Sequence, residues 1–324
     1  MDGIKKKITS LTVCFVVLAM GIATFLGVTA LKDIGNRDSN QLLLLMCETG
    51  QKNLDSYFKN VEQSVSMVSA YVESDLDGLD DAKLQAHLER VRFFFNRLAY
   101  KSSGILTYYY RIDPAISQNV KGFWYVNNGE GIMEHEVTDI SRYDVRDTSK
   151  LVWFTVPRNT GRAVWLPPYI TDNLGARVIS YNVPVYYQGK FVGVIGIELD
   201  YFNVANIINN ITMYEGGYAF LNDEEGKIIY HPRMDVMTME EQPAVPRGLL
   251  SNYKFVNYNF EGVEKQAVWL PLSNGMRLNL TVPVNELNAD WQRWSVRMLV
   301  IYVVLLIFFI VVIRIAIGRL FPDR

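Results

Sequence analysis

The sequence has few of the residues that most often carry catalysis, metal binding or cross-linking. Its 324 residues include only two cysteines and three histidines: Cys14, Cys47, His87, His135 and His231. Cys14 lies in a long apolar run and Cys47 outside it, so we do not expect them to form a disulfide with each other. The fold must therefore rest on its apolar core. We expect Cys47 to be a buried thiol in a helix, with a bridge between two chains as the alternative.

The sequence also lacks an excess of charge and the motifs of common enzymes. The net charge is −2 with 20% charged residues, so neither a nucleic-acid-binding face nor an acidic disordered tail is expected. There is no phosphate-binding GxxxxGK[ST] and no GxSxG elbow. Glu134-His135-Glu136 is a poor metal site, because neighbouring side chains of a strand point to opposite faces. We therefore expect no catalytic residue, cofactor or metal in this chain.

Two long apolar runs are present, at 8–31 and 298–318, and only Arg314 interrupts the second. A helix that crosses the hydrocarbon core needs about 20 apolar residues, so each run predicts a transmembrane helix. A cleaved signal peptide is the alternative for 8–31, but the run is long for one and has no convincing cleavage site. The second run has no polar face, which argues against a buried core helix.

Basic residues lie between each apolar run and the nearer chain end, at Lys5–Lys7, Arg319 and Arg324. Because Lys and Arg are retained in the cytoplasm, this pattern predicts two cytoplasmic termini, the second a stub at 319–324. The residues between the two runs are then expected on the outer side of the cell membrane, either periplasmic or extracellular.

The first part of the exterior segment has the spacing of helices. From about Gly35, apolar residues recur every three or four positions, and this pattern breaks at 74–81, where turn-forming residues gather. We expect a second helix at 82–99, capped by Asp80 or Asp81.

After Tyr100 the sequence becomes rich in aromatic and branched residues separated by Gly, Pro and Asn, which predicts strands. A first set is expected at 105–113, 122–128, 151–157, 177–187 and 190–201, with a hairpin turn at Gln188-Gly189. A short helix at 202–211 should follow. A second set of hairpins is expected at 217–222, 227–232, 254–260, 265–272 and 276–283. Together the elements predict an α+β fold.

These segments resemble a known family. Trp153-Phe154, Trp165-Leu-Pro-Pro-Tyr169, Pro184-Val185 and 193–198 are similar to the membrane-distal half of a double Cache domain, and 217–232 to its membrane-proximal half. The resemblance covers about 32–290. It implies a long N-terminal helix and two PAS-like subdomains, at 32–211 and 212–290. Double Cache domains are extracellular sensors of bacterial chemoreceptors, sensor kinases and nucleotide cyclases, and they usually bind small molecules in the distal subdomain.

The same resemblance marks candidate ligand-binding residues: Trp153, Phe154, Trp165, Tyr169, Thr171 and Glu198. Amino-acid-binding members commonly have an R-x-W-Y series, in which Leu151 stands here for the arginine. Lys150 is adjacent but is expected to face the other side of a strand. A later Y-x-D ends in Thr171, with Asp172 displaced by one position. Aromatic walls with few polar groups are typical of small-molecule sites, and a filled aromatic core is the alternative.

Glu198 among aromatic rings favours an amine or another cationic metabolite over a free amino acid or organic acid. We expect a homodimeric transmembrane sensor that binds a small ligand and relays a helix shift inward. A membrane-tethered scaffold or adhesion module is the alternative. Because only 319–324 follow the second run, we expect an output domain in a longer chain or a partner. A diguanylate cyclase is favoured by analogy over a histidine kinase or chemoreceptor.

Overall fold

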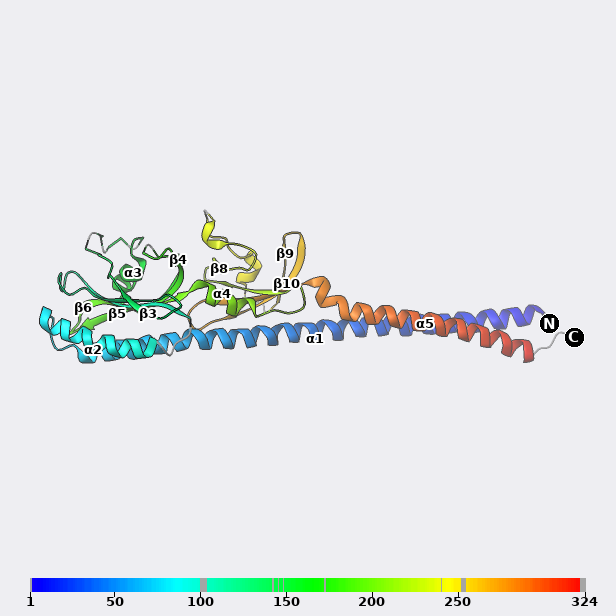
Figure 1. Ribbon diagram of the computed structural model, residues 1–324. Helices are drawn as coiled ribbons and strands as arrows, with labels where there is room; N and C mark the ends of the chain where they lie inside the picture. The colour runs from blue at the N-terminus through cyan, green and yellow to red at the C-terminus, as the bar shows by residue number, and fades with distance from the viewer. Residues whose placement is uncertain are drawn as a thin grey trace.

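The computed structural model describes residues 2–99, 104–141, 143–144, 146–147, 149–171, 173–239, 241–251 and 255–320. A single helix, α1 (Asp2–Asp75), runs beside two antiparallel sheets that follow each other along its length (Figure 1). With a rise of 1.5 Å per residue, α1 is roughly 110 Å long. The last helix, α5 (Val284–Leu320), returns beside α1, so both ends of the chain lie at the same end of the molecule.

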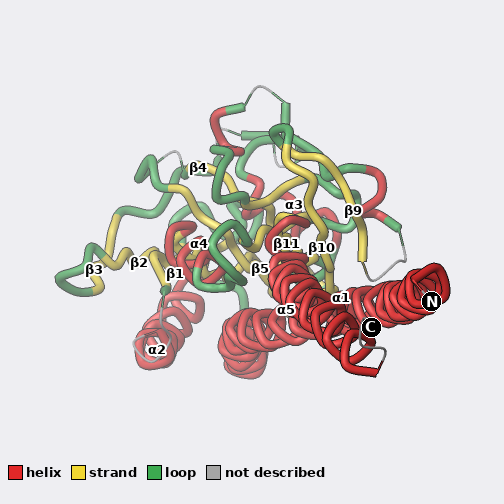
Figure 2. Tube along the Cα trace, turned by 90° about the vertical axis from the view of Figure 1, so that its right-hand side faces the viewer, coloured by secondary structure: helices red, strands yellow, loops and turns green. Residues whose placement is uncertain are grey.

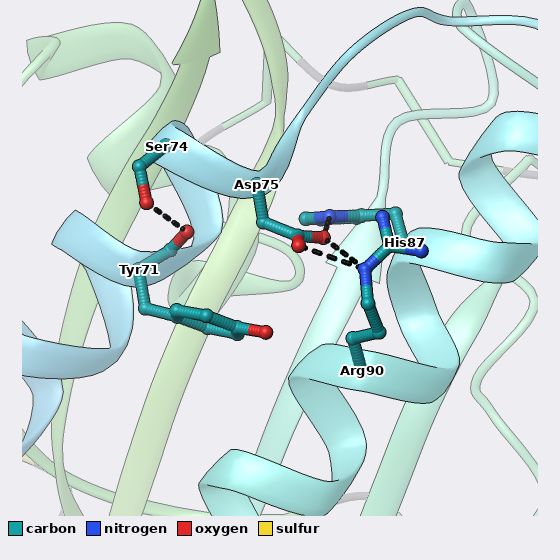
Figure 3. A network of polar contacts seen from close by, with 5 residues as sticks. All are labelled: Tyr71, Ser74, Asp75, His87 and Arg90. Atoms are coloured by element: carbon teal, nitrogen blue, oxygen red, sulfur yellow. Dashed lines mark hydrogen bonds and ion pairs between the residues drawn. The ribbon is translucent and has the colours of Figure 1, made fainter.

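The two helices predicted before residue 100 are confirmed. The first, α1, continues without a break from the apolar run to Asp75, and α2 (Asp81–Ala99) folds back beside it. Asp80 caps α2 by accepting a hydrogen bond from Lys83 N at 3.1 Å. At this turn Asp75 accepts hydrogen bonds from His87 Nδ1 at 2.7 Å and Arg90 Nε at 2.8 Å (Figure 3). We call Asp75, His87 and Arg90 the α1–α2 clamp.

The sheet farther from the chain ends has six antiparallel strands in the order β3-β2-β1-β6-β5-β4. They are β1 (Ile105–Ile112), β2 (Gly122–Asn127), β3 (Ile132–His135), β4 (Val164–Ile170), β5 (Arg177–Tyr187) and β6 (Lys190–Asp200). Because side chains alternate along a strand, Tyr108 and Tyr110 of β1 pack in the core shared with α1 and α2, while Tyr109 faces the other side. On that other side lies α3 (Val152–Thr160) (Figure 1).

The strand predicted at 151–157 is wrong, because these residues begin α3. Their aromatic and β-branched composition favours a strand, but the segment buries one helical face, formed by Phe154, Thr155 and Pro157, against the sheet. Leu151 takes a left-handed conformation just before the helix, with φ of 47°. Tertiary packing thus outweighs local propensity here. Neither β3 nor β4 was in the predicted strand sets, although 134–136 was taken as part of a strand.

The second sheet has five antiparallel strands in the order β8-β7-β11-β10-β9. They are β7 (Tyr218–Asn222), β8 (Ile228–Tyr230), β9 (Phe255–Phe260), β10 (Val263–Pro271) and β11 (Arg277–Pro283), close to the predicted ranges. It is joined to the first sheet by α4 (Tyr201–Asn209), the predicted short helix. The short helices η1 (Val236–Thr238) and η2 (Arg247–Leu250) lie between β8 and β9 and pack on the face of this sheet away from α1 (Figure 2).

Cys47 is buried between α1 and the second sheet, with its Sγ 3.9 Å from the carbonyl oxygens of Val268 and Leu278. This placement confirms the expected buried thiol. Burial raises the pKa of Cys47 to about 12, so the thiol stays protonated at neutral pH.

Small residues bring α1 and α5 close together. A Cβ atom added at Gly27 would lie 2.9 Å from Met298 Cε, and one at Gly35 would lie 2.6 Å from Trp291 Cβ. Glycine at these positions therefore permits the close approach of the two helices. Both helices contain an unburied window long and apolar enough to cross a membrane.

Candidate functional site

A cavity of about 260 Å³ opens on the face of the six-stranded sheet that carries Tyr109 and α3. Its floor comes from β1, β2 and β6, and one wall from 137–138, Tyr143 and 149–151 with the start of α3. The opposite wall comes from the end of β4 and the turn that follows. Strands that are distant in sequence thus bring a small set of polar groups into one hollow.

Glu198 of β6 is the acidic group of this cavity. It pairs in register with Thr107 of β1 and is only 4% exposed. Tyr169 donates its hydroxyl hydrogen to Oε1 at 2.7 Å, and Thr107 donates to Oε2. Burial raises the pKa of Glu198, and these two hydroxyl donors oppose the shift. Because a carboxylate accepts about four hydrogen bonds, Glu198 has capacity for further donors from a ligand.

Aromatic rings form the floor beside this carboxylate. The rings of Tyr109 and Trp153 meet nearly edge to face, with centroids 4.9 Å apart, and Tyr109 donates its hydroxyl hydrogen to Asn182 Oδ1. Burial and the nearby Glu198 hold the pKa of Tyr109 well above its usual value, so it remains a neutral donor. Gly196 makes room for this ring, because a Cβ there would lie 2.6 Å from Tyr109 Cζ and 2.5 Å from Asn182 Oδ1.

Two basic side chains also line the cavity, Arg111 of β1 and Lys150 before α3. Arg111 is 2% exposed and donates to the carbonyl oxygens of Thr138, Ile112 and Lys121. Burial lowers the pKa of Arg111 to about 10, which leaves it charged at neutral pH. Arg111 stands four residues beyond Thr107, so its backbone lies roughly 13 Å along the strand from the Glu198 position. The cavity therefore carries opposite charges at separate places.

The expected direction of Lys150 is wrong. It was placed on the far side of a strand, but the segment that follows is a helix, and Lys150 lines the cavity. A basic side chain therefore does accompany the aromatic residues, although Leu151 stands in place of the family's arginine.

The structure brings four of the six predicted ligand-binding residues to the cavity, namely Trp153, Tyr169, Thr171 and Glu198. The other two do not line it. Phe154 is fully buried in the core beneath α3. Trp165 faces α1, where its ring meets Phe58 at 4.9 Å and its Nε1 donates to Glu62 at 2.7 Å. Asp172 lies outside the described residues.

Sequence reasoning missed several residues of the cavity: Tyr109, Arg111, Trp124, Thr138 and Asn173. Alternation along β1 was the available signal, since Thr107, Tyr109 and Arg111 share a face. Asn173 and Thr138 come from opposite walls, and Asn173 Nδ2 donates to Thr138 Oγ1 at 2.7 Å. The sequence contains no pattern that predicts the Asn173–Thr138 contact, because it joins two loops.

A comparison with protein families decides the identity of the fold. The model of the Cache domain family matches residues 30–291. The chain belongs to the Cache domain family. It is 30% identical over 133 residues to the methyl-accepting chemotaxis protein PscA of Pseudomonas syringae pv. tomato. The matched residues make up 41% of this chain and 21% of PscA. The chain thus spans only about a fifth of the length of the curated relatives it matches.

Solved structures of chemoreceptor sensor domains share the architecture of this Cache domain. The ligand-binding domain of PctB from Pseudomonas aeruginosa, in complex with L-Arg, has a TM-score of 0.55 and 18% identity, covering 77% of this chain and 97% of that domain. The domain of CtaA from Pseudomonas fluorescens, in complex with L-serine, has a TM-score of 0.53 and 17% identity, covering 77% and 99%. The predicted α+β class, with a long N-terminal helix and two sheets, is confirmed.

Proposed function

We propose that this Cache domain is the ligand-binding part of a transmembrane receptor, and that the cavity beside Glu198 holds the ligand. The observation that carries this proposal is a solute-sized cavity lined by Trp153, Tyr169 and Glu198. A scaffold or adhesion module would have no use for such a cavity, and a buried carboxylate inside it is costly unless it serves a partner. The cavity and its buried carboxylate therefore favour a sensor over a scaffold or adhesion module.

The ligand we propose is a small amine that also carries a carboxylate or another acceptor. Glu198 binds the ammonium group through charge-assisted hydrogen bonds, and the faces of Trp153 and Tyr109 add cation–π attraction. Lys150 and Arg111 supply positive charge elsewhere on the lining, so a zwitterion suits the cavity better than a simple amine. L-arginine and L-serine, named in the related complexes, both have this form.

We also propose the topology that the flanking charges predict. Both chain ends lie in the cytoplasm, the subdomain at 32–211 is distal to the membrane, and the subdomain at 212–290 is proximal. Reporter fusions after Gly129 and after Arg324 test this arrangement. A cytoplasmic signal from the Gly129 fusion would overturn it.

The signal in this proposal passes along α1. One face of α1 packs on β5 and β6 of the sheet that bears the cavity, and the same helix continues into the apolar run. A shift of α1 relative to α5 would therefore reach the cytoplasmic side, where a signalling domain of the chemoreceptor or histidine kinase class would respond. Diguanylate cyclase output and homodimer formation stay predictions.

Calorimetric titration of the full chain in detergent tests the ligand proposal, with L-arginine, L-glutamine, L-serine, a simple amine and a dicarboxylate as probes. We expect saturable binding of at least one amino acid. Because a hydrogen bond to a charged group contributes about 1.5–3 kcal/mol, Glu198→Gln should weaken binding about 10- to 150-fold. Tight dicarboxylate binding that Glu198→Gln leaves unchanged would contradict the proposal.

A further inference from the structure

Another buried charged group lies in the five-stranded sheet, at Lys265 of β10. Lys265 is 1% exposed, and its Nζ has no hydrogen-bond partner in the part of the chain that the structure describes. A buried ammonium without a hydrogen-bonded counter-charge is strongly unfavourable, and packing alone favours an apolar residue at such a position. Stability alone therefore does not explain Lys265, and the distal cavity lies on the other sheet.

Aromatic rings surround this lysine. Its Nζ lies 4.2 Å from the ring centroid of Tyr218 and 6.0 Å from that of Phe260. The ring of His231 packs against both, with centroids 5.1 Å and 5.2 Å away. Arg233 lies over Tyr218 at 5.0 Å. Cation–π attraction offsets part of the cost of the buried charge. It does not replace the hydrogen bonds that a carboxylate or carbonyl oxygen would accept from the ammonium group.

Charged and titratable groups of both signs lie around Lys265. Arg233 and His231 come from the residues just after β8, and the neighbouring Glu261 is half exposed and bonded to Arg233 Nη1 at 3.3 Å. Glu286 accepts a hydrogen bond from the backbone of Gly216. Burial, together with Arg233, lowers the pKa of Lys265, and burial with Lys265 and Arg233 lowers that of His231 to about 4. None of these groups accepts a hydrogen bond from Lys265 Nζ, so a bound anion would supply the counter-charge and acceptor that the buried ammonium lacks.

We propose that Lys265 and His231 form a second ligand site, which binds a small monocarboxylate. His231 Nδ1 accepts a hydrogen bond from Arg233 N at 3.1 Å, so the neutral ring carries its hydrogen on Nε2 and can donate it. The lysine supplies up to three donors. The neighbouring cluster is apolar, formed by Phe220, Ile228, Val236, Val245, Leu249 and Ala267, and so favours an anion with a short hydrocarbon tail over phosphate.

The two sites differ in charge and lie on different sheets. The distal cavity has the buried carboxylate of Glu198, whereas the proximal site has the buried ammonium of Lys265. The residues after β8 cover the proximal site, and a bidentate pair between Arg177 and Asp235 ties them to β5, at 2.9 Å and 3.0 Å. A ligand at Lys265 must displace this cover, and through Arg177 it would act on the turn that borders the distal cavity.

Titration of the full chain with sodium propionate, in a buffer free of carboxylates, tests this site. We expect saturable binding with one site per chain. Loss of a charge-assisted hydrogen bond in Lys265→Met should weaken propionate binding at least about 10-fold. Lys190→Met, at an exposed lysine of the six-stranded sheet, is the matched control and should leave propionate binding unchanged. Absence of saturable binding, or equal affinity in wild type and Lys265→Met, would overturn the proposal.

Thermal unfolding gives a second, independent measurement. Replacing a buried unpaired charge by an apolar side chain of similar length should raise the melting temperature of the free protein, so Lys265→Met should melt higher than wild type. Propionate should raise the melting temperature of wild type and not that of Lys265→Met. A lower melting temperature or failed folding of Lys265→Met, or equal stabilisation of wild type by inorganic phosphate, would contradict a monocarboxylate site.

Discussion

Replacing Asp75 by alanine should weaken the end of the molecule farthest from the apolar runs, where the α1–α2 clamp joins the two helices (Figure 3). The His87 side chain is 1% exposed, so the loss of its partner leaves a buried polar group unpaired, at a cost of about 1–3 kcal/mol. The Arg90 side chain is 46% exposed, so its ion pair adds less than about 1 kcal/mol. We expect a loss of about 2 kcal/mol. For a domain of this size class, that lowers the melting temperature by roughly 4–8 °C.

Acid should weaken the same clamp in the wild type. Burial lowers the pKa of His87 below its usual 6.5, so the unfolded chain takes up the proton first and stability falls as the pH drops below 6.5. Burial alone would raise the pKa of Asp75, but the hydrogen bonds from Arg90 and His87 lower it below 3.8. Its contribution is therefore complete above pH 3.8 and is lost as the pH falls through the lower folded value.

Thermal unfolding of the full chain in detergent, at neutral and mildly acidic pH, measures both effects. Asp77→Ala is the matched control, since Asp77 is exposed in the same turn and its removal should change stability by less than about 0.5 kcal/mol. Asp75→Ala should also steepen the loss of stability between neutral and mildly acidic pH, because Asp75 opposes the lowering of the His87 pKa. If Asp75→Ala and Asp77→Ala have the same melting temperature at every pH, the clamp contributes no stability and this reasoning is refuted.

Three further predictions concern the cavity, the tie between the sheets and the buried thiol. Gly196→Ala should cost about 1–3 kcal/mol and weaken ligand binding in calorimetry, because its Cβ displaces the cavity floor. Gly131→Ala, where a Cβ meets nothing within 4 Å, should do neither, and equal effects would contradict the packing argument. Arg177→Ala should change stability by less than about 1 kcal/mol yet speed hydrogen exchange around Asp235, and unchanged exchange would count against the tie. Cys47 should resist iodoacetamide in the folded chain, and rapid native labelling seen by mass spectrometry would contradict its burial.

Periodicity in the sequence was sufficient for most of the fold. The three-and-four spacing of α1 and α2 indicates one-sided burial, and aromatic and branched residues between turn formers indicate the strands of the second sheet. The structure has both sets of elements close to the expected residues. The segment 151–160 shows the limit of this reasoning. Its composition favours a strand, but its neighbours in space, which local sequence does not encode, select a helix.

The candidate site was only partly predictable for a related reason. Glu198 stands out because an acidic residue inside an apolar strand needs an explanation. Tyr109 and Arg111 lie on a strand where both faces are buried, so alternation alone does not tell the cavity face from the core face. Phe154 and Trp165 were assigned to the ligand from the family resemblance, and the structure places both in packing roles.

The most direct test of the central claim is a thermodynamic cycle that combines a change in the protein with a change in the ligand. The tightest amino acid of the titration panel and its N-acetyl derivative, which has no ammonium group, are each titrated into wild type and Glu198→Gln. If Glu198 holds the ammonium group, acetylation should weaken wild-type binding by about 10- to 150-fold more than it weakens binding to Glu198→Gln. Equal losses in both proteins would contradict a Glu198–ammonium contact and, with it, the proposed ligand site.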